Sequence, residues 1–112
     1  MSSNIMQFDV IEVTKVDSKR ESIFKKYVVV SNNLVNNASS HIWVQPIEQR
    51  RSLYVTDIPL LTKRKVYDEY MIDSGKIECV NSNQYFISVV DKVQPRVQKM
   101  MMESIQAHTD IV

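Results

Sequence analysis

Residues 25–51, KKYVVVSNNLVNNASSHIWVQPIEQRR, decide the fold. Their four consecutive strand formers, YVVV, are too few for a buried helix, so residues 23–31 (IFKKYVVVS) predict a strand covered on both faces, which we expect to be central. The segment NNLVNNASS predicts a loop, because Asn and Ser side chains hydrogen-bond to nearby backbone groups. Residues 41–47 (HIWVQPI) predict the next strand. Two strands with a basic pair at each end therefore form the middle of the fold.

Turn-forming clusters of Asn, Ser and Asp divide the rest of the chain, which has only one Gly and three Pro. Pro59 should end one strand, since it cannot donate to a ladder. The remaining predicted strands are residues 5–16, 51–58, 66–72, 77–80 and 84–93. From Pro95 the apolar side chains recur at helical spacing and predict a helix over residues 95–108.

These elements predict a mainly β fold with a C-terminal α-helix. Six or seven short strands and one helix suit a small SH3-like or partly open barrel, with an OB-fold as the alternative. With 112 residues, of which 44% are hydrophobic, the chain is long enough for one core and too short for two, so residues 1–112 should form a single domain.

The formal charge of +1 conceals an asymmetry. Residues 1–65 hold ten of the 14 basic side chains and six acidic ones, whereas residues 66–112 hold four and seven. We expect an anion such as a nucleic acid to meet the first half of the chain. The simpler interpretation is that these charges only keep a small β domain soluble.

Several kinds of chemistry are excluded by missing motifs. The sequence has no Gly-rich phosphate loop, nucleophile elbow, paired-His zinc motif or acidic calcium loop, so we expect no metal and no cofactor. Cys79 is the only cysteine, which excludes an internal disulfide. No apolar run is long enough to cross a membrane, and residues 1–9 lack a signal-peptide pattern, so we expect a cytoplasmic protein.

Aromatic and basic residues are interleaved along the chain. Single-stranded nucleic acid needs this mixture, because exposed rings stack on bases while Lys and Arg neutralise phosphates. Phe24, Tyr27 and Tyr54 are equally suited to a core, and exposure of Trp43 tests the stacking interpretation. The candidate nucleic-acid contacts are Arg20, Trp43, Arg50, Arg51, Arg64 and Lys65.

The order of the segments resembles a known family. FDVIEV (residues 8–13), YVVVSNNLVNNASS (27–40), HIWVQPIEQ (41–49) and DSGKIECVNSNQYFISVVDKV (73–93) are similar in order to the MazF/PemK (Kid-like) toxins and their relative CcdB, and the likeness covers residues 6–108. It implies a homodimeric toxin that cuts single-stranded RNA without a metal and is neutralised by an antitoxin. The Trp-Gly-Ile tail of CcdB is not matched by HTDIV at residues 108–112.

The resemblance also suggests site residues. The family's catalytic Arg falls at Lys25 or Lys26, and its Thr or Ser after Pro-Ile falls at Glu48, while VDSKRES replaces its Gly-rich first loop. A Lys can stabilise a phosphorane-like charge as a point cation, with Arg20 beside it. Glu48 could accept the proton of a ribose 2′-hydroxyl, and so could His41, whose ordinary pKa lies near neutrality. The candidate catalytic residues are Lys25, Lys26, Glu48 and His41.

Two other functions remain open at this point. One is a non-catalytic OB-like domain that binds single-stranded nucleic acid or joins a larger assembly through its C-terminal helix. The other is a protein-binding inhibitor or adaptor, for example one of viral origin. RNA cleavage in EDTA separates the toxin from both, and salt-sensitive binding without cleavage favours the OB-like domain.

Overall fold

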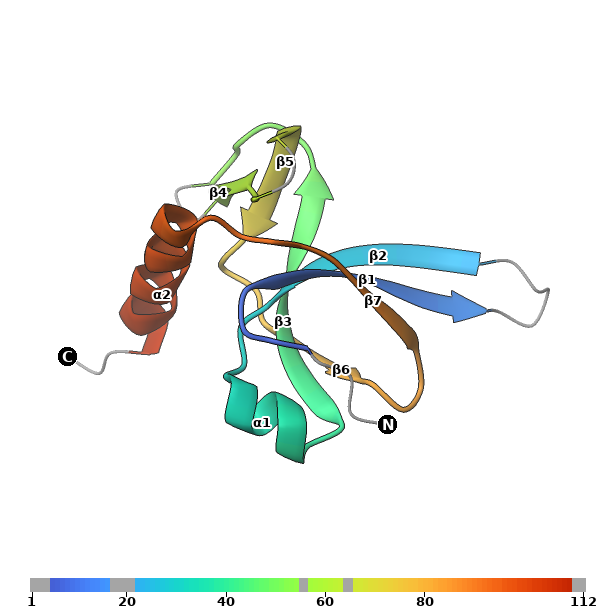
Figure 1. Ribbon diagram of the computed structural model, residues 1–112. Coiled ribbons are helices and arrows are strands. Elements are labelled where there is room, and N and C mark those ends of the chain that lie inside the picture. The colour runs from blue at the N-terminus through green and yellow to red at the C-terminus, as the bar shows by residue number, and fades with distance from the viewer. Residues whose placement is uncertain (1–4, 17–21, 55–56, 64–65, 110–112) are drawn as a thin grey trace.

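Seven strands and two helices make up the part of the chain that the computed structural model describes, residues 5–16, 22–54, 57–63 and 66–109 (Figure 1). All strand pairs are antiparallel. The strands are β1 (Asp9–Val16), β2 (Ser22–Val29), β3 (His41–Gln49), β4 (Asp57–Leu61), β5 (Val66–Asp73), β6 (Glu78–Asn81) and β7 (Phe86–Lys92), and the helices are α1 (Asn33–Ala38) and α2 (Pro95–Thr109).

The strands form one bent sheet in the order β4-β5-β3-β2-β1-β7, and β6 also pairs with β3. β3 connects the two halves of this sheet. Its first residues pair with β6, its middle pairs with β2, and its last residues, Ile47 to Gln49, pair with β5. The sheet is not closed, although an isolated bridge joins Thr62 to Val93 between the segments that follow β4 and β7. The prediction of a mainly β fold with a C-terminal helix is confirmed.

Buried apolar side chains form two clusters on opposite faces of β1 and β2. Val10 and Val28 point into the first cluster, which includes Leu60 of β4 and Val97 of α2. The neighbouring residues of β1 and β2 point the other way, because side chains alternate along a strand. This second cluster contains Ile5, Ile11, Val13, Tyr27, Val29, Ile42, Val44 and Val80. Each such side chain contributes about 1.5–3 kcal/mol on burial. Because β2 lies between β3 and β1 and contributes side chains to both clusters, it is central, as predicted, and Tyr27 is a core residue.

The Asn-rich segment is the first place where the structure corrects the sequence interpretation. It forms the short helix α1 rather than a loop. Asn32 caps this helix, because its side-chain oxygen accepts a 3.0 Å hydrogen bond from the amide of Val35. The side chain of Asn36 is buried and binds the backbone oxygen of Ser31 at 2.9 Å. The Asn residues therefore begin and anchor a helix here.

Two strands begin four or more residues later than predicted. β1 begins at Asp9 and not at Ile5, because Phe8 has a φ of 69°, which interrupts an extended chain. β4 begins at Asp57, whereas a strand was expected from Arg51. Pro59 lies inside β4, opposite Met71, and does not end it. A Pro is tolerated there because β4 is the last strand of the sheet order and one side of its backbone needs no partner strand.

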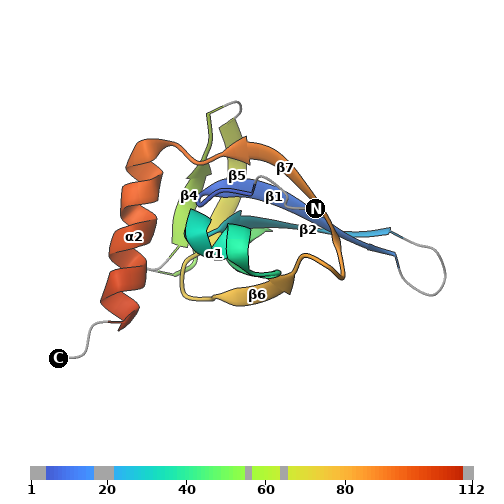
Figure 2. The same cartoon turned by 60° about the horizontal axis from the view of Figure 1, so that its bottom comes forward.

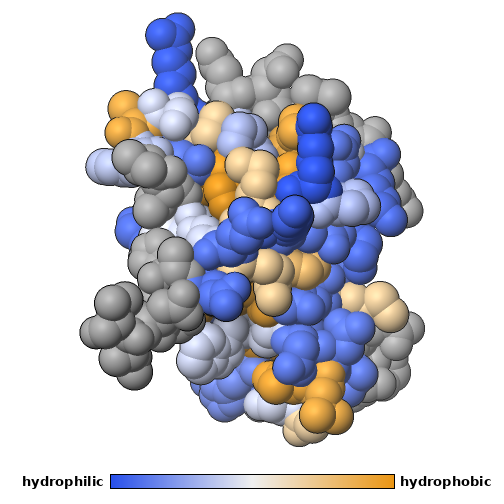
Figure 3. Space-filling model, turned by 90° about the vertical axis from the view of Figure 1, so that its left-hand side faces the viewer, coloured by the Kyte–Doolittle hydropathy of each residue, from blue (hydrophilic) through white to orange (hydrophobic). Residues whose placement is uncertain are grey.

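Helix α2 packs against the β4 side of the sheet (Figures 1 and 2). Its buried side chains include Val97 and Met101, whereas Met100, which its spacing placed on the same face, is 45% exposed. Hydrophobic side chains on this side of the molecule form small separate groups among hydrophilic ones (Figure 3). No helix within the described residues is long and apolar enough to cross a membrane.

Candidate functional site

A groove with a volume of about 540 Å³ lies over the second half of β3. Five strands and the turn before β6 contribute to its walls, and we name it the central groove. Its lining residues are Glu12, Lys25, Lys26, Tyr27, Pro46, Ile47, Glu48, Gln49, Tyr70, Lys76 and Glu78. The structure therefore brings together three of the four predicted catalytic residues, Lys25, Lys26 and Glu48.

The two neighbouring lysines of β2 have different surroundings. The ammonium group of Lys26 lies 3.9 Å from a carboxylate oxygen of Glu12, which is directly opposite it on β1. It also lies 5.5 Å from the centre of the Tyr70 ring, within the range of a cation–π contact. Lys25 is exposed. Lys26 is thus held against the groove wall, while Lys25 is open to solvent.

The acidic side chains of the groove face partners of their own. Glu48 accepts a hydrogen bond of 2.7 Å from Nε of Arg50, and its side chain is 41% exposed. Glu78 accepts a weak hydrogen bond of 3.5 Å from the hydroxyl of Tyr27. Burial, and then the nearby charge of Glu78, raise the pKa of Tyr27 to about 12. With three Lys and three Glu, the groove is balanced in charge rather than basic.

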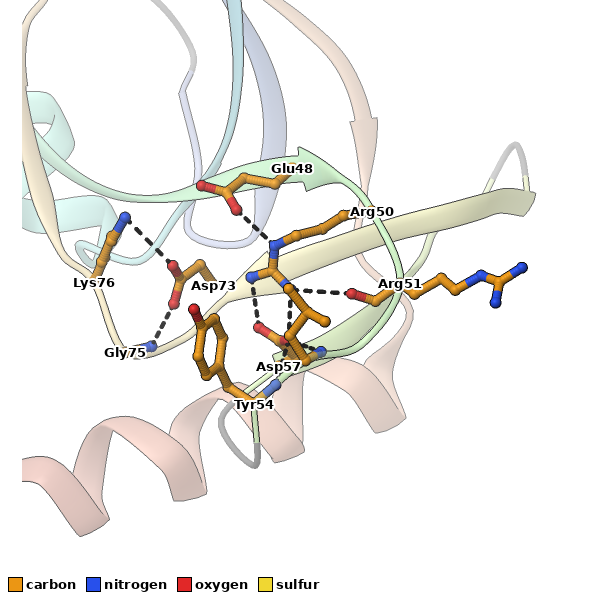
Figure 4. A network of polar contacts seen from close by, with 9 residues as sticks. Glu48, Arg50, Arg51, Tyr54, Asp57, Asp73, Gly75 and Lys76 are labelled. Atoms are coloured by element: carbon orange, nitrogen blue, oxygen red, sulfur yellow. Dashed lines mark hydrogen bonds and ion pairs between the residues drawn. The ribbon is translucent and has the colours of Figure 1, made fainter.

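Arg50 connects the groove to the loop between β3 and β4 (Figure 4). Its guanidinium group binds both carboxylate oxygens of Asp57, at 2.5 and 2.8 Å, in addition to Glu48. The side chain of Asp57 is fully buried, and it also accepts hydrogen bonds from the amides of Leu53 and Tyr54, at 2.8 and 2.9 Å. We name this set the Glu48–Arg50–Asp57 network.

The network shifts the pKa values of its members in opposite directions. Hydrogen bonds from Arg50 hold the pKa of Asp57 well below its usual range, although burial alone would raise it. The same hydrogen bonds, to Asp57 and then to Glu48, raise the pKa of Arg50 further above its usual value. Both groups therefore stay charged at neutral pH, and the loop is fixed to the end of β3.

The remaining predicted residues lie elsewhere. His41 is exposed at the start of β3, where Nδ1 lies 3.4 Å from the hydroxyl of Ser40. It precedes Glu48 by seven residues, roughly 23 Å along an extended strand, and it does not line the central groove. Trp43 is 54% exposed, as the stacking interpretation requires, but it also lies outside the groove lining.

The other predicted nucleic-acid contacts are divided. Arg50 is bound by its two carboxylates, and Arg51 is exposed in the loop that follows β3. Tyr54 is 61% exposed, so it is not the core residue that its sequence pattern allowed. Arg20, Arg64 and Lys65 lie outside the residues that the structure describes.

Sequence reasoning missed four charged or aromatic residues that line the groove, namely Glu12, Tyr70, Lys76 and Glu78. Glu12 was the easiest to find, because an acidic residue on β1 opposite a lysine of β2 follows from the hairpin register. The others come from segments after residue 65 that only the folded sheet brings to β2. Among the described residues, no group of three or more His, Cys, Asp or Glu side chains could hold a metal ion, and Cys79 is exposed and free.

Comparisons with known proteins give a fold but no sequence relative. No protein-family model and no curated protein matches the sequence. One chain in the MazE–MazF complex of Deinococcus radiodurans superposes with a TM-score of 0.79 over 98% of this chain and 99% of that one, at 7% identity. A mycobacterial endoribonuclease gives a TM-score of 0.70 at 14% identity, over 96% of this chain and 92% of the other.

A third solved structure, a mycobacterial endoribonuclease in complex with its cognate antitoxin, gives a TM-score of 0.72 at 14% identity over 96% of this chain and 99% of that one. All three likenesses extend over nearly the whole of both chains. The chain therefore has the MazF fold, which confirms the fold that the sequence resemblance implied. The comparisons give no support to the OB-fold alternative.

Proposed function

We propose that this protein is a toxin-like endoribonuclease that binds single-stranded RNA in the central groove and cleaves it without a metal ion. The observation that supports this most directly is the convergence of Lys25, Lys26 and Glu48 in one groove of a chain with the MazF fold. The similar mycobacterial structures are endoribonucleases, which agrees with an RNA substrate.

In the proposed reaction Glu48 accepts the proton of a ribose 2′-hydroxyl. The 2′-oxygen then attacks the neighbouring phosphorus, and the 5′-oxygen leaves and takes a proton from solvent, which yields a 2′,3′-cyclic phosphate and a 5′-hydroxyl. Lys26 stabilises the additional negative charge on the phosphoryl oxygens, and Lys25, whose side chain leaves the opposite face of β2, contacts a neighbouring phosphate. An ammonium group lacks the forked geometry of a guanidinium, so each lysine acts as a point charge.

The balanced charge of the groove is compatible with this role. The pair between Lys26 and Glu12 is partly exposed and spans 3.9 Å, and such pairs are worth only about 0–1 kcal/mol. A phosphate can therefore compete for Lys26 at little cost. The charge of Glu48 would repel that phosphate, and Arg50, 2.7 Å from its carboxylate, offsets part of the repulsion, since Arg50 also pairs with Asp57.

Glu48 is a better proton acceptor than His41 in this arrangement. A general base must reach the hydroxyl that it deprotonates, within about 3 Å or through one water molecule. Glu48 lines the same groove as the two lysines, whereas His41 lies at the far end of the strand. We therefore assign the role of general base to Glu48.

The same proposal includes two protein partners and a location. The MazE–MazF complex and the endoribonuclease–antitoxin complex support an antitoxin that neutralises this chain. A homodimer follows from the sequence resemblance, and an RNA substrate implies action in the cytoplasm.

The test is cleavage of single-stranded RNA by the purified protein in excess EDTA. We expect wild-type protein to produce fragments with cyclic phosphate ends and the Lys25→Ala/Lys26→Ala variant to produce almost none. Arg96→Ala/Lys99→Ala is the matched control, since it removes two exposed cations of α2, and it should cleave normally. RNA that stays intact with wild-type protein at high concentration would refute the enzymatic proposal.

A further inference from the structure

A second hollow adjoins the central groove. Its volume is about 430 Å³, and it shares two wall residues with the groove, Glu48 and Lys76. Its other walls are Arg50, Leu53 and Tyr54 of the β3–β4 loop and the turn residues Asp73 and Gly75. We name it the side hollow. Because of the shared walls, a chain bound in the central groove can place its next unit in the side hollow.

Tyr54 combines exposure with a fixed position. Its ring is centred 5.4 Å from the guanidinium carbon of Arg50, and its amide donates to the buried carboxylate of Asp57 at 2.9 Å. Residue Tyr54 is nevertheless 61% exposed. An aromatic ring that is held in place and still open to solvent loses little conformational entropy when a flat ligand stacks on it.

The charged groups around this ring are already paired. Glu48 binds Arg50, and Asp73 lies 3.7 Å from the ammonium group of Lys76 and accepts from the amide of Gly75 at 3.2 Å. The side chain of Lys76 is 63% exposed, so its remaining donors can reach an anion between the two cavities. The side hollow thus presents an aromatic surface with one cation at its border, and its carboxylates are neutralised by neighbours.

We propose that the side hollow is a nucleobase subsite, in which a base of single-stranded RNA stacks on Tyr54 while Lys76 contacts the adjacent phosphate. This inference rests on the proposed function, since it places the base next to the phosphate that Glu48 and the β2 lysines would process. Base–aromatic stacking is largely independent of sequence, so Tyr54 adds affinity and register more than base identity.

The experiment measures binding of a short fluorescein-labelled single-stranded RNA to the full chain by anisotropy. The RNA carries 2′-O-methyl groups, which remove the attacking hydroxyl and prevent cleavage. Tyr54→Ala should weaken binding roughly 5- to 100-fold, and Tyr54→Trp should restore most of it, because stacking on an aromatic ring is retained. Phe86→Ala is the matched control, since Phe86 is a 73% exposed aromatic residue of β7 that lines neither cavity.

Abasic substitutions then locate the base. Removing bases one at a time should reveal one position whose loss weakens binding to wild-type protein but not to Tyr54→Ala. Equal penalties in both proteins, or unchanged affinity of Tyr54→Ala, would overturn the subsite. If Lys25→Ala/Lys26→Ala still loses binding in that case, the proposed function stands without the subsite. If wild-type protein binds no RNA, the proposed function itself fails.

Discussion

The two ends of β3 carry similar chemistry in different surroundings. At the start of the strand, His41 and Trp43 are exposed and pair with β6. Neither residue lines the central groove. At its end, Glu48 lies in a groove with Lys25 and Lys26 and is tied to Arg50. Both ends offer a proton acceptor and aromatic or basic neighbours, but only the second end is concave and has its charges oriented by partners.

The pairing of β3 explains how the groove arises. β3 changes its partner from β6 to β5 along its length, and the bend brings β2, β5 and the turn before β6 around its last residues. A catalytic group needs neighbours that hold it and a cavity that admits the substrate. The end of β3 has both, so variants at the two ends of the strand should differ in their effect on RNA binding and cleavage.

The largest effect should come from Glu48→Gln. If Glu48 is the general base, its loss should lower the cleavage rate by about 10²- to 10⁴-fold, because the neutral amide cannot accept the 2′-hydroxyl proton. RNA affinity should stay the same or increase, since a negative charge near the phosphate is removed. Single-turnover cleavage and anisotropy on the same RNA measure the two quantities.

His41→Gln is the matched variant at the other end of the strand, and it should cleave RNA at the wild-type rate. A loss of activity in His41→Gln with normal activity in Glu48→Gln would reverse the comparison between the two ends of β3.

The next largest effect should be on RNA affinity and on the way that affinity depends on salt concentration. Lys25→Ala/Lys26→Ala should weaken RNA affinity at least 10-fold near physiological salt, and it should reduce the slope of log affinity against log salt by about 1.4, since single strands lose about 0.7 per phosphate contact. Titrations at several salt concentrations measure the slope. An unchanged slope would mean that these lysines contact no phosphate.

The sequence predicts much of the fold and several of the residues that line the central groove. Short β-branched runs separated by Asn, Ser and Asp predict the strands, and the order of those runs led to the MazF fold. Of the predicted catalytic residues Lys25, Lys26, Glu48 and His41, the first three line the central groove. The helix α1 was missed because Asn is usually a loop residue, yet here Asn32 is a helix cap.

The Glu48–Arg50–Asp57 network could not be predicted for a different reason. Residues 51–58 were expected to be a strand, in which Arg50 and Asp57 would lie far apart, whereas the loop actually brings their side chains to 2.5 Å. The positions of Tyr70 and Lys76 beside β2 could not be predicted either, because the sheet order that brings them there depends on contacts between distant segments. Local patterns predict elements, and charge pairs across loops depend on the assembled fold.

A smaller effect, on stability, is expected from Asp57→Asn. The buried carboxylate accepts hydrogen bonds from Arg50 and two backbone amides, and bonds to charged groups contribute about 1.5–3 kcal/mol, so the free energy of unfolding should fall by about 1–3 kcal/mol. Urea denaturation at pH 7 measures the loss. Asp73→Asn serves as the comparison, because within the described residues Asp73 has one ion pair, to Lys76, and accepts one hydrogen bond from the amide of Gly75.

The pH dependence of this effect has a definite sign. Because the pKa of Asp57 is depressed in the folded state, its stabilisation is fully present above its unfolded pKa of about 3.9 and is lost as the pH falls further. The gap between wild type and Asp57→Asn should therefore narrow below about pH 4. A gap that stays constant down to about pH 2 would show that the charge of Asp57 is not what stabilises the loop.

The smallest effect is expected from Trp43→Ala. The residue is 54% exposed, so truncation leaves no buried cavity, and its backbone amide keeps the 3.1 Å hydrogen bond to the hydroxyl of Ser31. Because Trp43 lies outside the central groove, RNA affinity should change by less than about 3-fold, whereas a stacked base is worth roughly 5-fold or more. Anisotropy with the RNA used for Tyr54→Ala allows a direct comparison. If Trp43→Ala weakens binding as much as Tyr54→Ala, the RNA path extends along the whole of β3, and exposure of a ring then matters more than the concavity around it.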